Sequence, residues 1–164
     1  ICGDATFEGA MVMWVDRHTA ILASGVRTNR SGYEMVEAEL KRMGVTEVLH
    51  MQIPYGHAHI DGNLNFASHD IAMIHASQVP YDVCDALKKK GIKLLECPSQ
   101  TEAKESFAIN FVAIRPGLIV MPAGNPRSRE LLEKNGIEVI EIPFDEIMKG
   151  FGAIHCCTAF LKRG

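Results

Sequence analysis

The sequence predicts an α/β protein built from strand–strand–helix–strand units that repeat radially, as in an α/β propeller. Two observations carry this prediction. First, a helix-like stretch with a lysine near its end leads to a glycine three times, and Gly44, Gly91 and Gly136 lie 47 and 45 residues apart. Glycine just past a cationic last turn is typical of a helix C-terminus. Second, two short apolar segments precede each such helix and a third follows it.

The strands are expected as pairs joined by polar turns ahead of each helix, with a third strand after it. Short apolar runs bounded by turn-forming residues are typical of strands. The expected pairs are residues 11–15 with 20–24, 63–67 with 71–75, and 109–114 with 118–121, and the third strands are 45–53, 92–97 and 137–142.

The expected helices begin at capping signals. Ser31 and Ser99 are each followed three residues later by a glutamate, which is the spacing of a capping box. Asn125 precedes a proline that suits the first turn of a helix. Pro80 is placed to begin the helix that ends before Gly91, and the helix after Ser99 is expected to be short.

Polar residues at equivalent places, just before the first strand of each unit, favour radial closure over an open solenoid. Radial closure of such repeats would bring these positions together at one axis. Three units and part of a fourth, residues 156–163, are visible, and the chain opens with Ile1. We therefore expect residues 1–164 to form a single domain, the C-terminal part of a ring that lacks one or more N-terminal units.

Composition indicates an ordinary globular domain. Hydrophobic residues make up 47% and charged residues 23% of the 164 residues. The net charge of −3 gives no electrostatic reason to expect a nucleic acid or an anionic membrane as a partner. No apolar run approaches the ~18 residues that span a bilayer, and no signal peptide pattern is present. Five cysteines without a C-x-x-C spacing favour free thiols, so a cytoplasmic location is expected.

Four polar residues near the unit starts are candidates for chemistry. Glu8, His59, Asn110 and Cys156 are separated by 51, 51 and 46 residues. A nucleophile, a base and an orienting carboxylate that come from different repeats are a plausible catalytic set. The pair His57-x-His59 also suggests a metal site, but no second ligand pair of suitable spacing appears, so neither a metal nor another cofactor is expected.

Four segments taken together resemble the guanidino-group-modifying superfamily, which includes arginine deiminases, dimethylarginine dimethylaminohydrolases and amidinotransferases. They are residues 7–10 (FEGA), 25–29 (GVRTN), 59–61 (HID) and 152–158 (GAIHCCT), and they occur in the family's order over nearly the whole chain. The resemblance implies a five-bladed α/β propeller, the pentein fold, with its active site in the central channel. One departure is Met11, where the family often has an aspartate.

The resemblance also implies roles for individual residues. Cys156 would be the nucleophile, because the family pattern Cys-x-Ser/Thr places it there rather than at Cys157. His59 would transfer protons, and Glu8 would orient it or modulate its charge. Two further residues would bind substrate: Asp61 would hold the guanidinium nitrogens, and Arg27 would hold a carboxylate by two parallel hydrogen bonds.

The role of Asn110 stays open between capping a turn and binding substrate. His155 either lines the site or supports it.

The expected function is hydrolysis of a guanidinium C–N bond of free arginine or a methylated arginine through a covalent cysteine–amidino intermediate. A thiolate is nucleophilic enough to attack this poor electrophile, and the cationic substrate would help to lower the thiol pKa. The alternatives are an amidinotransferase that passes the group to an amine, and a binding propeller without catalysis. The expected partner is a small guanidino compound, together with either a missing N-terminal segment or further copies of the chain.

Overall fold

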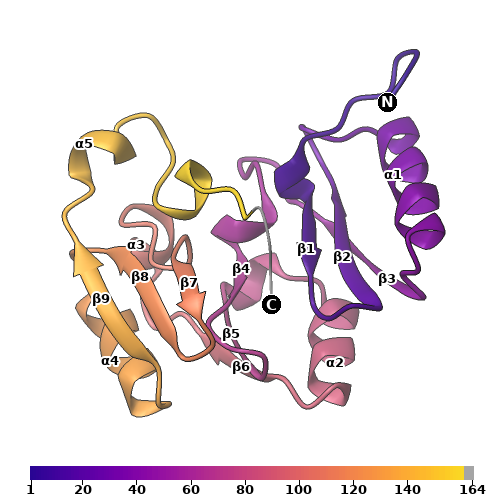
Figure 1. Ribbon diagram of the computed structural model, residues 1–164. Helices are drawn as coiled ribbons and strands as arrows, with labels where there is room; N and C mark the ends of the chain where they lie inside the picture. Colours follow the sequence, from indigo (N-terminus) through magenta and orange to yellow (C-terminus); the bar gives the residue numbers. More distant parts are fainter. Residues whose placement is uncertain (161–164) are drawn as a thin grey trace. The chain divides into compact units, whose positions relative to one another are not determined.

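The computed structural model describes residues 1–160 of the protein (Figure 1). These residues form two compact units. The first comprises Ile1–Ile60 and Ser77–Gly91, and the second comprises Asp61–Ala76 and the described chain from Ile92 onward. Within residues 1–160, no helix has both the length and the apolar character that crossing a membrane requires.

The strand–strand–helix–strand repeat is confirmed in three three-stranded sheets. In every sheet the first two strands pair antiparallel and the third pairs in parallel with the second. A parallel neighbour requires a long crossover, and a helix provides it each time. The sheets are β1(Val12–Trp14)–β2(Thr19–Ser24)–β3(Glu47–Gln52), β4(Leu64–Phe66)–β5(Ile71–Ile74)–β6(Lys93–Glu96) and β7(Val112–Arg115)–β8(Leu118–Pro122)–β9(Glu138–Ile142).

The crossover helices are α1 (Arg30–Arg42), α2 (Tyr81–Lys89) and α4 (Pro126–Lys134). In the described part of the chain, two short helices, α3 (Gln100–Lys104) and α5 (Asp145–Met148), stand outside the crossovers. The same residues contain four 3₁₀ turns: η1 (Gly9–Met11), η2 (Ile60–Gly62), η3 (Ala76–Gln78) and η4 (His155–Cys157). The predicted α/β class and its repeat therefore stand, whereas closure into a ring and the missing N-terminal blades remain predictions.

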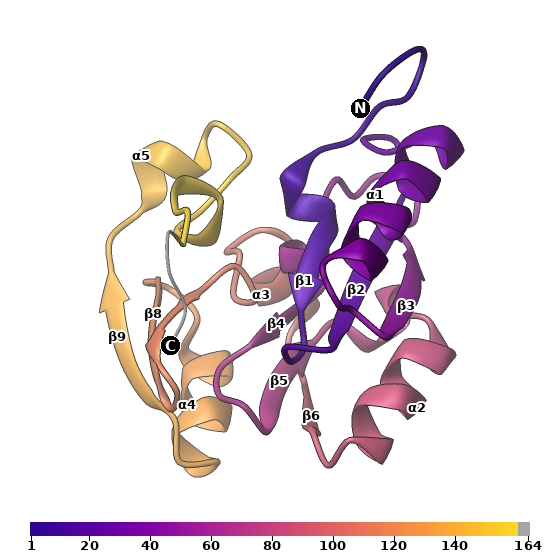
Figure 2. The ribbon, with the colours of Figure 1, turned by 45° about the vertical axis from the view of Figure 1, so that its right-hand side comes forward.

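In the first unit, α1 lies over the sheet β1–β2–β3 (Figure 2). The middle strand β2 is buried along almost its whole length, which agrees with the apolar run of residues 20–23 at its centre. Leu40 of α1 and Val45 pack on Ala20 and Leu22 of the sheet, and Phe7 joins them from the N-terminal segment. Helix α2 packs against β3 in the same unit.

In the second unit, the core forms around Phe111. Met73 from β5, Met121 from β8 and Leu132 from α4 share this buried cluster, and all four of these side chains are fully buried. The cluster therefore ties the sheets β4–β5–β6 and β7–β8–β9 of this unit to the helix α4. Asn65 adds a polar link, because its amide donates to two backbone carbonyls next to β7.

The three repeat glycines occupy the positions that the sequence predicted. Gly44, Gly91 and Gly136 have φ angles of +98°, +80° and +81°. A residue with a side chain is strained in this left-handed region, so glycine is favoured just past each crossover helix.

The helix starts agree with prediction only in part. Ser99 caps α3 as expected, since its hydroxyl accepts the N–H of Glu102 at 3.3 Å. The prediction for Ser31 is wrong: α1 begins at Arg30, and the side chain of Asn29 accepts the N–H of Gly32 at 2.9 Å. The same side-chain oxygen of Asn29 also accepts a hydrogen bond from the N–H of Thr6 in the N-terminal segment, and this contact favours Asn29 as the cap.

The start of α4 differs from prediction in its chemistry. Asn125 stands at the cap position, but its amide donates to two backbone carbonyls and its side chain makes no cap bond. The buried carboxylate of Glu102 instead accepts the N–H groups of Arg127 at 3.0 Å and Ser128 at 2.8 Å. A carboxylate at a helix N-terminus is favourable because the helix dipole is positive there.

One predicted strand region also differs, and the partial fourth unit can be described in part. Residues 109–111 precede β7, and Asn110 lies in a turn closed by its N–H to the carbonyl of Phe107 at 3.0 Å. The partial fourth unit starts with the 3₁₀ turn η4. The end of that predicted segment, residues 161–163, lies outside the described residues.

Candidate active site

The first unit brings together three of the predicted site residues: Glu8, His59 and Arg27. Glu8 lies in extended backbone just before η1, with φ −118° and ψ 140°. Its carboxylate is 2.6 Å from Nε2 of His59 and accepts a hydrogen bond from Nη1 of Arg27 at 3.1 Å. The acid, the histidine and the cation therefore form one chain of charge-assisted contacts.

These contacts keep Glu8 ionised. The hydrogen bond to His59 is the largest cause that lowers the pKa of the Glu8 carboxyl, and the nearby charge of Arg27 lowers it further against a partial loss of hydration. A neutral His59 bonded in this way carries its proton on Nε2 and its lone pair on Nδ1. Glu8 thus defines which ring nitrogen can accept a proton, as an orienting carboxylate must.

A tight turn presents Arg27 to Glu8. The N–H of Gly25 donates to the carbonyl of Thr28 at 3.1 Å, and the N–H of Thr28 donates to the carbonyl of Gly25 at 3.3 Å. Arg27 lies within this turn with 52% of its side chain exposed. An exposed guanidinium keeps its fork of donors accessible to a ligand.

The second unit brings together Asp61, Asn110 and Cys156. Nδ2 of Asn110 donates to Oδ2 of Asp61 at 2.9 Å and lies 3.2 Å from Sγ of Cys156. The Cys156 thiol donates to Oδ2 of Asp61 at 3.6 Å. Asp61 keeps only 5% of its side chain exposed, so a nearly buried carboxylate lies directly beside a thiol.

Asn110 also binds the backbone at the start of η4, as the capping alternative requires, while its role in substrate binding stays a prediction. Its Oδ1 accepts the backbone N–H of His155 at 3.0 Å and that of Cys156 at 3.4 Å, at the start of η4. The same side chain therefore holds the backbone that carries the nucleophile candidate and contacts its sulfur.

His155, whose role the sequence left open between lining the site and supporting it, joins this group. Nδ1 of His155 lies 2.8 Å from Oδ2 of Asp61. The only signal in the sequence was its position next to Cys156. Thr158, the hydroxyl of the Cys-x-Thr pattern, donates to the carbonyl of His155 at 2.9 Å.

The environment favours the neutral form of the Cys156 thiol. Burial of the sulfur is the largest cause that raises the pKa of Cys156, followed by the negative charge of Asp61, while hydrogen bonds from the backbone of Ala153 and from Asn110 lower it. The residue as a whole is exposed, as is Cys157. A cation arriving beside Asp61 would offset the carboxylate's effect on the thiol.

Gly152 lies against the same cysteine. A Cβ at position 152 would come within 3.2 Å of Cβ and 3.5 Å of Sγ of Cys156. The residue before it, Phe151, has φ +61° and is 92% exposed. The glycine therefore allows the preceding loop to approach the nucleophile candidate closely.

The described residues contain no group of three or more His, Cys, Asp and Glu side chains that is arranged to hold a metal ion. The alternative of a metal site at His57-x-His59 consequently gains no support from the geometry of residues 1–160.

Comparison with known proteins gives a family match. A family model described as arginine deiminase matches residues 69–163. An uncharacterised protein of Bacillus subtilis (strain 168) is 29% identical over 162 residues, which cover 98% of this chain and 54% of that protein. The N(G),N(G)-dimethylarginine dimethylaminohydrolase of Pseudomonas aeruginosa is 27% identical over 160 residues, 93% of this chain and 55% of the relative. This chain spans about half the length of the curated relatives it matches.

Solved structures show the same fold. A Pseudomonas aeruginosa dimethylarginine dimethylaminohydrolase in complex with citrulline matches with a TM-score of 0.73 and 25% identity over 93% of this chain and 55% of that one. The inosamine-phosphate amidinotransferase of Streptomyces griseus matches with a TM-score of 0.81 and 18% identity over 96% of this chain and 47% of that one.

Proposed function

Since the chain belongs to the arginine deiminase family of guanidino-group-modifying, pentein-fold proteins, we propose that it provides the nucleophile of a hydrolase that breaks a guanidinium C–N bond. The proposed substrates are free arginine and methylated arginines, and Cys156 is the proposed nucleophile. Substrate classes of the relatives support this choice, because one is named for arginine and another for dimethylarginine.

The observation that carries the proposal is the buried carboxylate of Asp61 beside the Cys156 thiol, 3.6 Å from Sγ to Oδ2. A guanidinium is cationic and planar, and a carboxylate binds it by charge-assisted hydrogen bonds. A substrate that binds Asp61 thus brings its positive charge and its carbon to the sulfur together. The same charge lowers the thiol pKa when the nucleophile is needed, so the resting thiol stays protonated and unreactive.

The proposed reaction has two steps. In the first, a C–S bond forms between Cys156 and the guanidinium carbon, and the tetrahedral adduct then loses ammonia or a methylated amine as its C–N bond breaks. The leaving nitrogen takes up a proton. In the second, water adds to the same carbon and gives up a proton, and the C–S bond breaks to release a urea-type product and the thiol.

His59 is the proposed proton carrier for both steps. It would protonate the leaving nitrogen and later deprotonate the water, roles that histidine fills most often in general acid–base catalysis. Its contact with the ionised Glu8, 2.6 Å between Nε2 and Oε2, supports this role because the carboxylate stabilises the protonated ring. Arg27 is the proposed partner of a substrate carboxylate, which its exposed position in a turn supports.

The test is turnover by the full-length polypeptide that contains this chain. Arginine and dimethylarginine should yield citrulline, and Cys156→Ser should abolish this because a serine hydroxyl is not ionised by the same environment. Cys157→Ser is the matched control and should retain most activity. Binding of arginine without any product would contradict the hydrolase and favour a binding protein. A product that appears only when an acceptor amine is added would favour the amidinotransferase.

Three broader expectations are part of the proposal. Residues 1–164 would act as a single catalytic domain within a longer ring, completed by a preceding segment or by further copies of the chain. A cytoplasmic location is proposed on the ground that none of the five cysteines forms a disulfide. Neither a nucleic acid nor a membrane is a proposed partner.

A further inference from the structure

Asn29 attaches the N-terminal segment of the first unit to the start of α1 through its side chain and its backbone. Oδ1 of Asn29 accepts the N–H of Thr6 at 3.0 Å, and Nδ2 donates to the carbonyl of Asp4 at 2.9 Å. The backbone N–H of Asn29 donates in turn to the hydroxyl of Thr6 at 3.2 Å. Three hydrogen bonds therefore clamp residues 4–6 to the residue that also caps the helix.

Gly32 allows this clamp to close. A Cβ at position 32 would lie 1.9 Å from the carbonyl oxygen of Thr6 and 2.8 Å from its carbonyl carbon. No side chain fits in that space, so the segment rests directly on the backbone of α1. The figures show the segment passing the start of α1 before it enters β1 (Figures 1 and 2).

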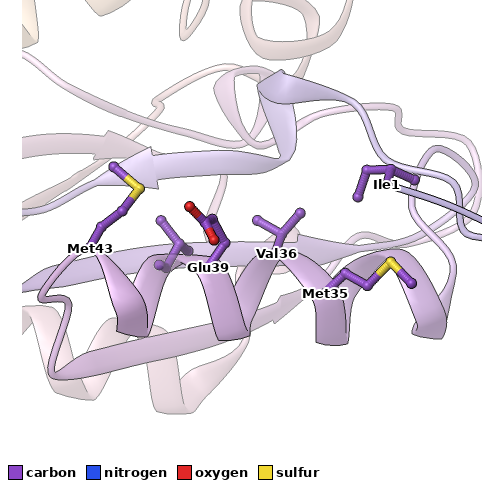
Figure 3. A pocket seen from close by; sticks show the side chains of 6 residues that line it. Ile1, Met35, Val36, Glu39 and Met43 are labelled. Atoms are coloured by element: carbon purple, nitrogen blue, oxygen red, sulfur yellow. The ribbon is translucent and has the colours of Figure 1, made fainter.

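The beginning of the same segment also lies along α1. Ile1, Met35 and Val36 line one groove on the helix (Figure 3). From the clamp at Thr6 only two residues lead to Glu8, about 7 Å of extended chain. Phe7 between them packs on the core of the unit, which provides a second anchor. A shift of Thr6 is therefore transmitted to Glu8 in part rather than in full.

We propose that Asn29, together with Gly32, is a positioning residue that holds Glu8 against His59 and Arg27 through Thr6. The proposal rests on the proposed function for its catalytic consequence, but its structural content is independent of it. The turn that carries Arg27 is followed directly by Asn29, so neighbouring residues hold both Glu8 and the segment before it. Arg27 contacts the Glu8 side chain, and Asn29 binds the backbone of Asp4 and the backbone and hydroxyl of Thr6.

The capping and clamping roles of Asn29 can be separated. Serine caps a helix about as well as asparagine. Its side chain ends in a hydroxyl on Cβ, so it is shorter than the asparagine carboxamide and has no amide group to donate to Asp4. Asn29→Ser should therefore keep α1 and loosen the clamp, because the bond to Asp4 is lost while the backbone bond to Thr6 stays. Gly32→Ala keeps Asn29 and opens the clamp by steric contact, although alanine favours a helix interior by about 0.5–1 kcal/mol over glycine. The control is Ser31→Ala, a neighbouring change on the same helix.

The experiment uses the full-length polypeptide and two readouts besides thermal stability. Carbon-13 NMR titration of Glu8 reports its contacts with His59 and Arg27, which hold its pKa below the ordinary value. In Asn29→Ser and in Gly32→Ala this pKa should rise toward the ordinary value, and kcat should fall about 10- to 100-fold, the range that a misplacement of up to 1 Å produces. Ser31→Ala should match the parent in both.

The outcomes separate this inference from the proposed function. A Glu8 titration that is unchanged in both variants overturns the positioning role, whatever happens to kcat. An equal effect of Ser31→Ala overturns it as well, because the change would then reflect the helix alone. If the parent has no turnover but the Glu8 pKa rises in both clamp variants, the proposed function fails and the positioning role stands.

Discussion

The close approach of Gly152 to Cys156 makes Gly152→Ala an informative perturbation. The added Cβ would lie 3.2 Å from Cβ of Cys156, and ordinary contacts between carbon atoms are about 3.5–4.0 Å. Cys156 must therefore move by at least about 0.3 Å, away from an Asn110 contact of 3.2 Å. Gly152 has no left-handed φ, so alanine should also gain about 0.4–1 kcal/mol from the less flexible unfolded chain.

The expected result is a loss of reactivity without a loss of stability. We expect kcat/KM to fall about 5- to 10-fold, a fraction of the 100-fold that a 1 Å misplacement can cost. The midpoint of thermal unfolding should stay within a few degrees of the parent. The assays are turnover of arginine and the alkylation rate of Cys156 by iodoacetamide, which is neutral and needs no cation site.

Gly150→Ala is the matched control. Its Cβ would meet the carbonyl oxygen of Ile147 at 3.3 Å and not Cys156. Parent-like alkylation and turnover in Gly152→Ala would refute the reasoning, because the loop would then not constrain the cysteine. Equal losses in both glycine variants would refute it too, since the effect would belong to the loop as a whole.

Three other predictions concern charge. Asp61→Asn should lower the pKa of Cys156, because burial and the Asp61 charge together raise it. The pH at which iodoacetamide alkylation reaches half its maximum rate should therefore fall. A rise in that pH would contradict the effect assigned to the Asp61 charge. The pKa of Glu8 is lowered by its bond to His59 and by Arg27. The contribution of Glu8 to folding stability is therefore present above the ordinary glutamate pKa and is lost as the pH falls through the lower pKa of the folded state. In Glu8→Gln, the midpoint of thermal unfolding should depend less on pH over that acid range than it does in the parent. Arg27→Lys should weaken arginine capture by about 1.5–3 kcal/mol, mainly in KM, and leave agmatine, which lacks the carboxylate, unaffected; agmatine turned over as well as arginine would exclude a carboxylate anchor.

The repeat could be predicted from the sequence because its signals are local. Gly44, Gly91 and Gly136 follow cationic helix ends, and each requires only its own backbone conformation to be understood. The turns between paired strands are likewise defined by a few adjacent residues. Local signals of this kind can be recognised in the sequence without knowledge of the tertiary fold.

The helix starts show where such signals are insufficient. Ser31 has capping-box spacing, yet Asn29 caps α1 because its side chain also binds Thr6, 23 residues away in the sequence. The N-terminus of α4 is capped by Glu102, which lies more than 20 residues upstream. In both cases a contact between distant segments decided the outcome, and no local pattern records it.

The candidate site shows the same difference between local signals and contacts of distant segments. Glu8 and His59 were paired from the order of motifs, and the structure shows them in contact. The bonds that join Asp61, Asn110 and His155 depend on three segments that meet in the second unit, and no local pattern in the sequence predicts these contacts. The 3₁₀ turn around Cys156 depends in the same way on Asn110, whose Oδ1 accepts the backbone N–H groups of His155 and Cys156.

The central claim is that Cys156 is a nucleophile for amidine-type carbon. The most direct measurement is labelling of the full-length polypeptide with a chloroacetamidine, followed by fragment mass spectrometry that distinguishes Cys156 from Cys157. The account predicts one label, on Cys156, with loss of turnover and with protection by arginine. A label on Cys157 or Cys84 that removes activity, while Cys156 stays unmodified, would contradict it.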